Sequence, residues 1–148
     1  MPLSGKKGVV FVVDDDPIAI KLLVNKLKHH TDITLYGYPT GEECLKETEH
    51  KPQVIILDFY LNSVNLDAIN GFQLLSDLRI KYPGVIPVLL SGRADLTTDS
   101  RSNLLDDALR NNNLNQFNEL LEKGAYFYFM KDTRATSLVY NLLIRLYR

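Results

Sequence analysis

The fold is best approached from the stretch "GVVFVVDDDP", residues 8–17, where an apolar run ends abruptly in three carboxylates. The five consecutive apolar residues have the length of a strand, and a continuous run is typical of a parallel strand buried on both faces. Asp16 followed by Pro17 is typical of a helix start, with Asp16 as N-cap and Pro17 at the first helical position. Asp14 and Asp15 then lie between strand and helix, where their mutual repulsion calls for a counter-charge.

Four further segments have the length and composition of strands. They are "ITLYGY" (33–38), "VIIL" (54–57), "VIPVLL" (85–90) and "AYFYFM" (125–130). The segments between them have helical periodicity, so the order βαβαβαβαβα predicts an α/β domain with a parallel sheet and right-handed crossovers. In a doubly wound five-stranded sheet of order 2-1-3-4-5, with helices on both faces, the first and third strands are central neighbours.

Polar side chains follow four of the five predicted strands. In sheets of this kind ligands bind beyond the carboxyl ends of the strands, at a switch point in the strand order. Asp14 and Asp15 follow the first strand, Asp58 the third, Ser91 the fourth and Lys131 the fifth. Any one of them alone is more often a solvated loop residue or a cap, so the joint pattern carries the argument.

The joint pattern suits phosphoryl chemistry. Gathered carboxylates are suitable ligands for Mg²⁺, a hard cation that prefers oxygen. An ammonium and a hydroxyl beside that cation would neutralise and hold the oxygens of a transferred phosphoryl group. A carboxylate can itself act as the nucleophile and form an acyl phosphate.

Four motifs, "VVDDDP", "VIILDFYL", "PVLLSG" and "FYFMKD", resemble in the same order the receiver domain of two-component response regulators. The resemblance spans nearly the whole chain and implies one flavodoxin-like receiver domain over residues 1–148, with Mg²⁺ as cofactor. It also implies a signalling domain rather than an enzyme, one that catalyses only its own phosphorylation and dephosphorylation. The phosphoryl donor would be a sensor histidine kinase or a histidine phosphotransfer protein.

The resemblance also assigns a role to each site residue. Asp58 would accept the phosphoryl group, and the metal would be held by Asp14, Asp15, Asp58 and the backbone carbonyl of Tyr60. Ser91 would donate to a phosphoryl oxygen, and Lys131 would pair with the same group. Ser91 and Tyr128 would form the conformational switch, although an ordinary core tyrosine is an equally good interpretation of Tyr128.

Two segments depart from the family pattern and look like insertions. The loop at about 61–70 is longer than usual by about one helical turn. The segment at about 95–122 predicts a fourth helix that is either extended or split in two at "RNNN". In the family, the 92–148 face serves output, so a downstream protein partner or a second copy would bind there. An elaborated packing helix without a new partner is the alternative.

Composition excludes several functions. The formal net charge of −1 gives no indication of direct nucleic-acid binding. No apolar run reaches the roughly 18 residues of a membrane span. The single cysteine, Cys44, has no partner within the chain, which favours a reducing compartment, and we expect a cytoplasmic protein.

Two other functions remain open from sequence. One is a pseudo-receiver, an interaction module with the same fold that works without phosphorylation. The other is a haloacid-dehalogenase-type phosphatase, with Asp14 as nucleophile and Asp16 as acid, which leaves Asp58 without a role. A P-loop enzyme is excluded because GxxxxGK[ST] is absent.

Overall fold

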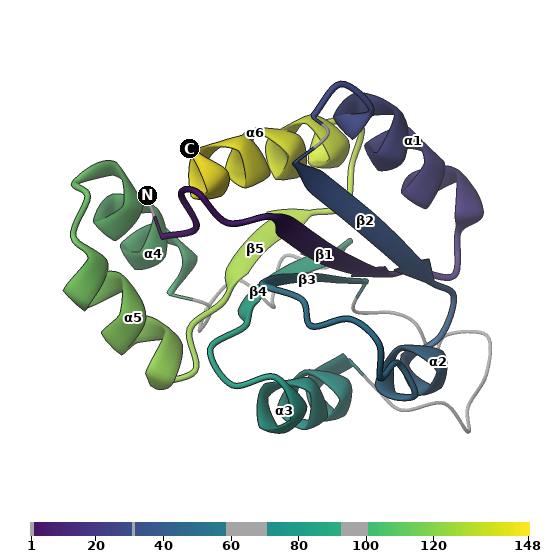
Figure 1. Ribbon diagram of the computed structural model, residues 1–148, viewed down its shortest axis with the longest axis horizontal. Coiled ribbons are helices and arrows are strands. Elements are labelled where there is room, and N and C mark those ends of the chain that lie inside the picture. The colour runs from purple at the N-terminus through teal and green to yellow at the C-terminus, as the bar shows by residue number, and fades with distance from the viewer. Residues whose placement is uncertain (1, 31, 59–70, 93–100) are drawn as a thin grey trace.

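A computed structural model describes residues 2–30, 32–58, 71–92 and 101–148 (Figure 1). The strands are β1 (Gly8–Val13), β2 (Ile33–Tyr38), β3 (Val54–Asp58), β4 (Ile86–Ser91) and β5 (Phe127–Met130). The helices are α1 (Pro17–Leu27), α2 (Gly41–Leu45), α3 (Gly71–Lys81), α4 (Ser102–Arg110), α5 (Leu114–Glu122) and α6 (Ala135–Tyr147). Tyr60, the segment 61–70 and residues 95–100 of the second unusual segment lie outside the described residues.

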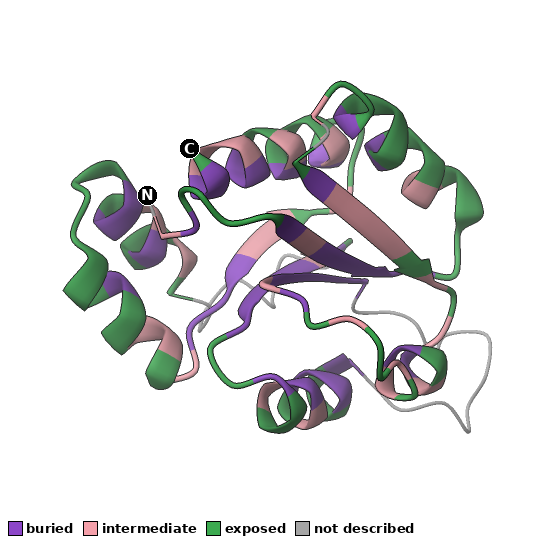
Figure 2. Ribbon diagram, in the orientation of Figure 1, coloured by how far each residue is buried: buried purple, intermediate pink, exposed green. Residues whose placement is uncertain are grey.

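The strands form one parallel sheet of order β2-β1-β3-β4-β5, which confirms the predicted topology. Residues of the central strands are almost all buried, as their unbroken apolar runs predict (Figure 2). β5 begins at Phe127, two residues later than predicted. The difference arises because the N–H of Ala125 still donates to the carbonyl of Leu120, closing the end of α5.

Helices cover both faces of the sheet. Figure 1 shows α1 and α6 on one side and α2 and α3 on the other, with α4 and α5 beside β5. Alternate strand residues supply two cores: Val12, Ile56 and Val88 belong to the α1 and α6 side, and Phe11 and Leu57 to the other. Both cores lie directly behind the carboxyl edge of the sheet and hold its strand ends in place.

The second core also encloses the single cysteine. Cys44 of α2 has no exposed surface, and burial raises the pKa of its thiol to about 12. The thiol is therefore un-ionised at neutral pH and shielded from solvent reagents.

The fourth helix is split at the predicted "RNNN". Asn112 adopts a left-handed backbone (φ 52°), and the N–H of Asn113 donates to the carbonyl of Ala108, which closes α4. The side chain of Asn113 then accepts from the N–H of Gln116 and caps α5. Asparagine tolerates the left-handed region better than most residues, so this tripeptide turns the chain between two helices.

Apolar residues on three of the helices are exposed. Val24 of α1, Phe72 of α3 and Leu138 of α6 are 45%, 47% and 39% exposed, whereas Leu74 of α3 and Val139 of α6 are buried. Periodicity predicts which residues share a stripe, but the position of the core relative to that stripe depends on packing.

No helix within the described ranges is long and apolar enough to cross a lipid bilayer.

Candidate functional site

Three carboxylates meet at the carboxyl edge of the sheet. β1 and β3 are paired up to Val13 and Leu57, so Asp14 and Asp58 are the next residues on neighbouring strands. Asp15 joins them, and the three side chains each offer an oxygen within 4.8 Å of the others. Asp14 and Asp58 are buried, whereas Asp15 is exposed. The structure thus brings together the three predicted carboxylates, two inside the fold and one open to solvent.

Lys131 bridges the two buried carboxylates. Its Nζ donates to Oδ2 of Asp58 at 2.7 Å and lies 3.2 Å from Oδ2 of Asp14. The lysine follows the edge strand β5, and the N–H of Lys131 donates to the carbonyl of Ser91 at 2.8 Å, extending the β4–β5 pairing. The ammonium group is therefore held between β1 and β3 by the end of the sheet itself.

The remaining aspartate of "DDD" has a different task. Asp16 Oδ1 accepts from the N–H of Ile18 and caps α1, as predicted. The N–H of Asp16 donates to Oδ1 of Asp14 at 2.9 Å. The helix start therefore orients Asp14 as well as turning the chain.

Opposing effects act on the pKa values of the cluster. The pKa of Asp14 is raised, mainly by burial and also by the negative charge of Asp58. The hydrogen bond from the N–H of Asp16 and the charge of Lys131 lower it, but not enough to cancel the rise. Burial by itself would lower the pKa of Lys131, but the hydrogen bond and charge of Asp58, followed by the charge of Asp14, raise it. The site thus stabilises the charged form of Lys131 and destabilises the charged form of Asp14.

The residues present fit Mg²⁺. Three carboxylates and one ammonium leave two negative charges uncompensated, which a divalent cation would match. Carboxylate oxygens are suitable ligands, and the exposed Asp15 gives the cation a route from solvent. Asp14, Asp15 and Asp58 are the described residues that would hold it; the carbonyl of Tyr60 lies outside the described residues.

Ser91 and Tyr128 lie beside this cluster and contact each other. Ser91 ends β4 and is fully buried. The hydroxyl of Tyr128, a half-buried residue of β5, donates to the backbone carbonyl of Ser91 at 3.3 Å. Tyr128 also packs against the second core, so both interpretations of this residue have structural support.

Sequence reasoning missed Ser102, in the first turn of α4. Its hydroxyl accepts the backbone N–H of Tyr128 at 3.1 Å. β5 is an edge strand, so this N–H points away from the sheet and needs an acceptor from elsewhere. Two hydrogen bonds therefore connect Ser91 through Tyr128 to α4, a link that no local sequence signal could reveal.

Comparisons with known proteins agree with this geometry. The family model for the response regulator receiver domain matches residues 10–106, more than half of the chain. No curated protein sequence matches the chain.

Solved receiver domains share the fold at low sequence identity. The BeF3-activated receiver domain of DrrB, an OmpR/PhoB homologue from Thermotoga maritima, is 22% identical, with a TM-score of 0.61, covering 94% of this chain and 96% of that one. A CheY-like receiver domain protein from Methanospirillum hungatei JF-1 is 18% identical, with a TM-score of 0.61 and coverage of 94% and 93%. The signal receiver domain of an HD domain-containing protein from Pseudomonas fluorescens Pf-5 is 19% identical, with a TM-score of 0.63 and coverage of 99% and 91%.

Proposed function

Because the chain belongs to the family of response regulator receiver domains, we propose that it accepts a phosphoryl group on Asp58 in a two-component or phosphorelay pathway. The observation that carries the proposal is the 2.7 Å contact between Lys131 Nζ and Asp58 Oδ2 inside a cluster of three carboxylates. A buried carboxylate beside a fixed ammonium is well placed to receive a group that carries several negative oxygens.

In the proposed reaction, an oxygen of Asp58 attacks phosphorus as the bond from phosphorus to a donor histidine nitrogen breaks. The product is an acyl phosphate on Asp58. Lys131 orients Asp58 before transfer and pairs with a phosphoryl oxygen afterwards, and the Ser91 hydroxyl donates to another oxygen. Mg²⁺, held by Asp14, Asp15 and Asp58 with the Tyr60 carbonyl, would supply further neutralisation of the phosphoryl charge.

The surface beside the site supports a protein as donor. Ile18 and Leu22 of α1 are 65% and 52% exposed, and they line the same small hollow as Asp14 and Lys131. An apolar surface at the rim of a charged site suits docking of a sensor histidine kinase or a histidine phosphotransfer protein. The kind of partner and the single cysteine, which has no second cysteine to pair with in the chain, support the cytoplasm as the proposed place of action.

The proposed output is the 92–148 face, reached through the switch pair. Ser91 moving toward a phosphoryl group would shift the carbonyl that Tyr128 contacts, and Tyr128 in turn contacts Ser102 of α4. The domain is thus proposed as a switch whose only chemistry is its own phosphorylation and dephosphorylation.

The deciding experiment is incubation with acetyl phosphate and Mg²⁺, followed by intact-mass measurement. Wild type should gain one phosphoryl group, Asp58→Ala should gain none, and Asp77→Ala, which removes a carboxylate of α3, should behave as wild type. A gain by Asp58→Ala would reject the proposed acceptor.

The two other functions predict different results. A pseudo-receiver would show no gain in any variant while a known receiver in the same buffer is phosphorylated. A phosphatase of the haloacid-dehalogenase type would release phosphate in a manner that depends on Asp14 and Asp16 and not on Asp58. Asp16 is occupied as the cap of α1, which disfavours that role.

A further inference from the structure

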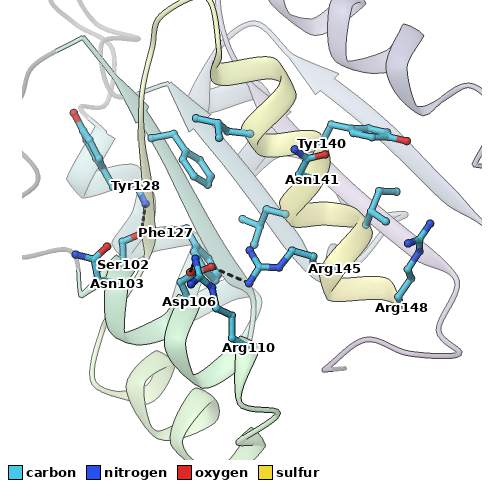
Figure 3. Close-up of a pocket in the computed structure, with 14 residues that line it drawn as sticks. Ser102, Asn103, Asp106, Arg110, Phe127, Tyr128, Tyr140, Asn141, Arg145 and Arg148 are labelled. Carbon is cyan, nitrogen blue, oxygen red and sulfur yellow. Dashed lines mark hydrogen bonds and ion pairs between the residues drawn. The ribbon is translucent and has the colours of Figure 1, made fainter.

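A hollow among the described residues lies between α4, β5 and α6 and is distinct from the acidic cluster (Figure 3). It has a volume of about 760 Å³, enough for one or two large side chains. Phe127 and Leu142 are buried at its base, Phe129 and Ile144 are half-buried, and Leu138 is 39% exposed. This hollow, which we call the α4–α6 groove, is therefore lined by apolar surface accessible to a partner.

The charged side chains that line the α4–α6 groove are mostly basic. They are Asp106 and Arg110 of α4 with Arg145 and Arg148 at the end of α6. Asp106 Oδ2 lies 2.9 Å from Arg110, and its Oδ1 lies 2.8 Å from Arg145, so one carboxylate is shared by two guanidinium groups. The contact with Arg145 is an ion pair without hydrogen-bond geometry.

The groove is thus a positive site on a slightly negative chain. Three arginines against one aspartate leave two positive charges at the groove, whereas the whole chain has a formal net charge of −1. Arg148 is exposed, and Arg110 is exposed although it is paired with Asp106, so both guanidinium groups can reach a partner's charges. Figure 3 shows these arginines toward the lower right of the groove, with Tyr128 and Ser102 on its left side.

We propose that the α4–α6 groove binds an acidic segment of a partner protein that inserts a large apolar side chain between α4 and α6. Carboxylates on the segment would pair with Arg110 and Arg148 while the apolar residue covers Phe127, Phe129 and Leu138. The inference deepens the proposed function, since it names the chemistry of the output partner.

Charge disfavours a second copy as the occupant. A two-fold symmetric dimer brings the same patch together from both subunits, so two surfaces of net positive charge would face each other. Like charges brought together cost affinity, and the one carboxylate available, Asp106, is already shared within each subunit.

A nucleic acid is also disfavoured. The arginines would attract phosphates, but a sugar–phosphate backbone has no large apolar group to cover the apolar floor of the groove, and it would also meet the carboxylate of Asp106.

The test is selection of random twelve-residue peptides displayed on phage against the immobilised protein, without phosphodonor. Selected sequences should be enriched in Asp and Glu flanking Leu, Phe or Trp. The best synthetic peptide should bind about tenfold more weakly to the double variant Arg110→Glu, Arg148→Glu and weaken as salt rises. Lys51→Glu reverses an exposed charge outside the groove and should bind as wild type. Thermal melts check that the double variant is folded.

Several results would overturn the proposal. They are selected peptides that are basic or uncharged, absence of enrichment, and equal binding to the double variant. Displacement of the peptide by a duplex oligonucleotide would assign the groove to nucleic acid, and a wild-type dimer abolished by the double variant would assign it to a second copy.

The result is separable from the phosphorylation proposal. Peptide binding is measured on unphosphorylated wild type and on Asp58→Ala, and phosphorylation by mass. Acidic-peptide binding without any phosphoryl gain would support the groove proposal and reject Asp58 as acceptor. Phosphoryl gain on Asp58 without peptide binding would support Asp58 and reject the groove proposal.

Discussion

The molecule contains two carboxylate-centred networks that behave in opposite ways. In the acidic cluster of Asp14, Asp58 and Lys131, burial and a neighbouring negative charge raise the pKa of Asp14. In the second network, Glu47 accepts from the hydroxyl of Tyr38 at 2.7 Å and from the N–H of Glu49 at 2.7 Å. These donors, followed by those of His50, lower the pKa of Glu47 to about 2.

The difference lies in what surrounds each carboxylate. Glu47 is met by hydrogen-bond donors, so its charge stabilises the folded loop after α2. Asp14 shares a buried site with a second carboxylate, and its described counter-charge is the ammonium of Lys131. One network holds the fold together, and the other keeps a local conflict that a ligand can relieve.

Lys131→Ala should have the largest effect on stability, because it leaves Asp14 and Asp58 buried without a counter-charge. Removing one partner of a buried pair costs about 3–5 kcal/mol, and Lys131 is one-third exposed, so we expect a loss of about 2 kcal/mol. Urea unfolding with and without Mg²⁺ measures it, and Mg²⁺ should restore part of the loss. Lys123→Ala, which removes a lysine from an exposed ion pair, is the control. Equal losses of unfolding free energy in the two variants would contradict the idea that Lys131 compensates buried negative charge in the acidic cluster.

Glu47→Gln should lower the Tm at pH 7 and be unaffected by Mg²⁺. The folded pKa of about 2 lies below the ordinary value of 4.5, so the stabilisation from Glu47 is complete above about pH 4.5. It is lost as the pH falls from there through about 2. Melts from pH 7 to pH 2 should therefore show the two proteins converging in acid, with Glu49→Gln following wild type. A constant difference across that range would mean that the charge of Glu47 is not what stabilises the loop.

Asp14→Asn should act in the opposite direction and stabilise the metal-free protein by about 1 kcal/mol at pH 7. The raised pKa of Asp14 means that its carboxylate destabilises the fold at neutral pH. That penalty shrinks as the pH falls through the raised folded pKa and is gone below about 3.8, where the side chain is protonated in both states. Denaturant unfolding at pH 7 and pH 4 tests this, and stabilisation by Mg²⁺ should be lost in the variant. A variant that is less stable than wild type at pH 7 would refute the expectation.

Ser102→Ala should have the smallest effect and asks whether the acidic cluster is connected to α4. The variant removes the acceptor of the Tyr128 N–H, so we expect a loss of about 0.5 kcal/mol, with phosphoryl gain on Asp58 unchanged. The exposed Ser137→Ala of α6 should be neutral. Solution NMR of both variants shows which residues change chemical shift. Changes confined to α4 in Ser102→Ala would argue against a link to Ser91.

Sequence reasoning succeeded where the signal was local. The cap at Asp16 and the break at "RNNN" each depend on neighbours along the chain, and both are confirmed. The strand order then placed Asp14, Asp15, Asp58 and Lys131 at one edge, and the structure brings them together.

Sequence reasoning failed where the exposure or the partner of a side chain depends on residues far away along the chain. The exposure of Leu138 at the α4–α6 groove could not be predicted, because the orientation of α6 is fixed by packing and not by its own period. Ser102 and the Asp106–Arg145 pair were missed for the same reason, since their partners are 26 and 39 residues away along the chain.

The reactivity of the buried Cys44 thiol measures how often the core around it opens. The thiol's surroundings are the core on the α2 and α3 side of the sheet, and it is inert while that core is closed. Its rate of alkylation under native conditions therefore reports how often the core on the α2 and α3 side opens, and not the core on the α1 and α6 side. Because β1 and β3 supply both this core and the acidic cluster, a cation bound at the strand ends should slow a reaction occurring in the interior behind them.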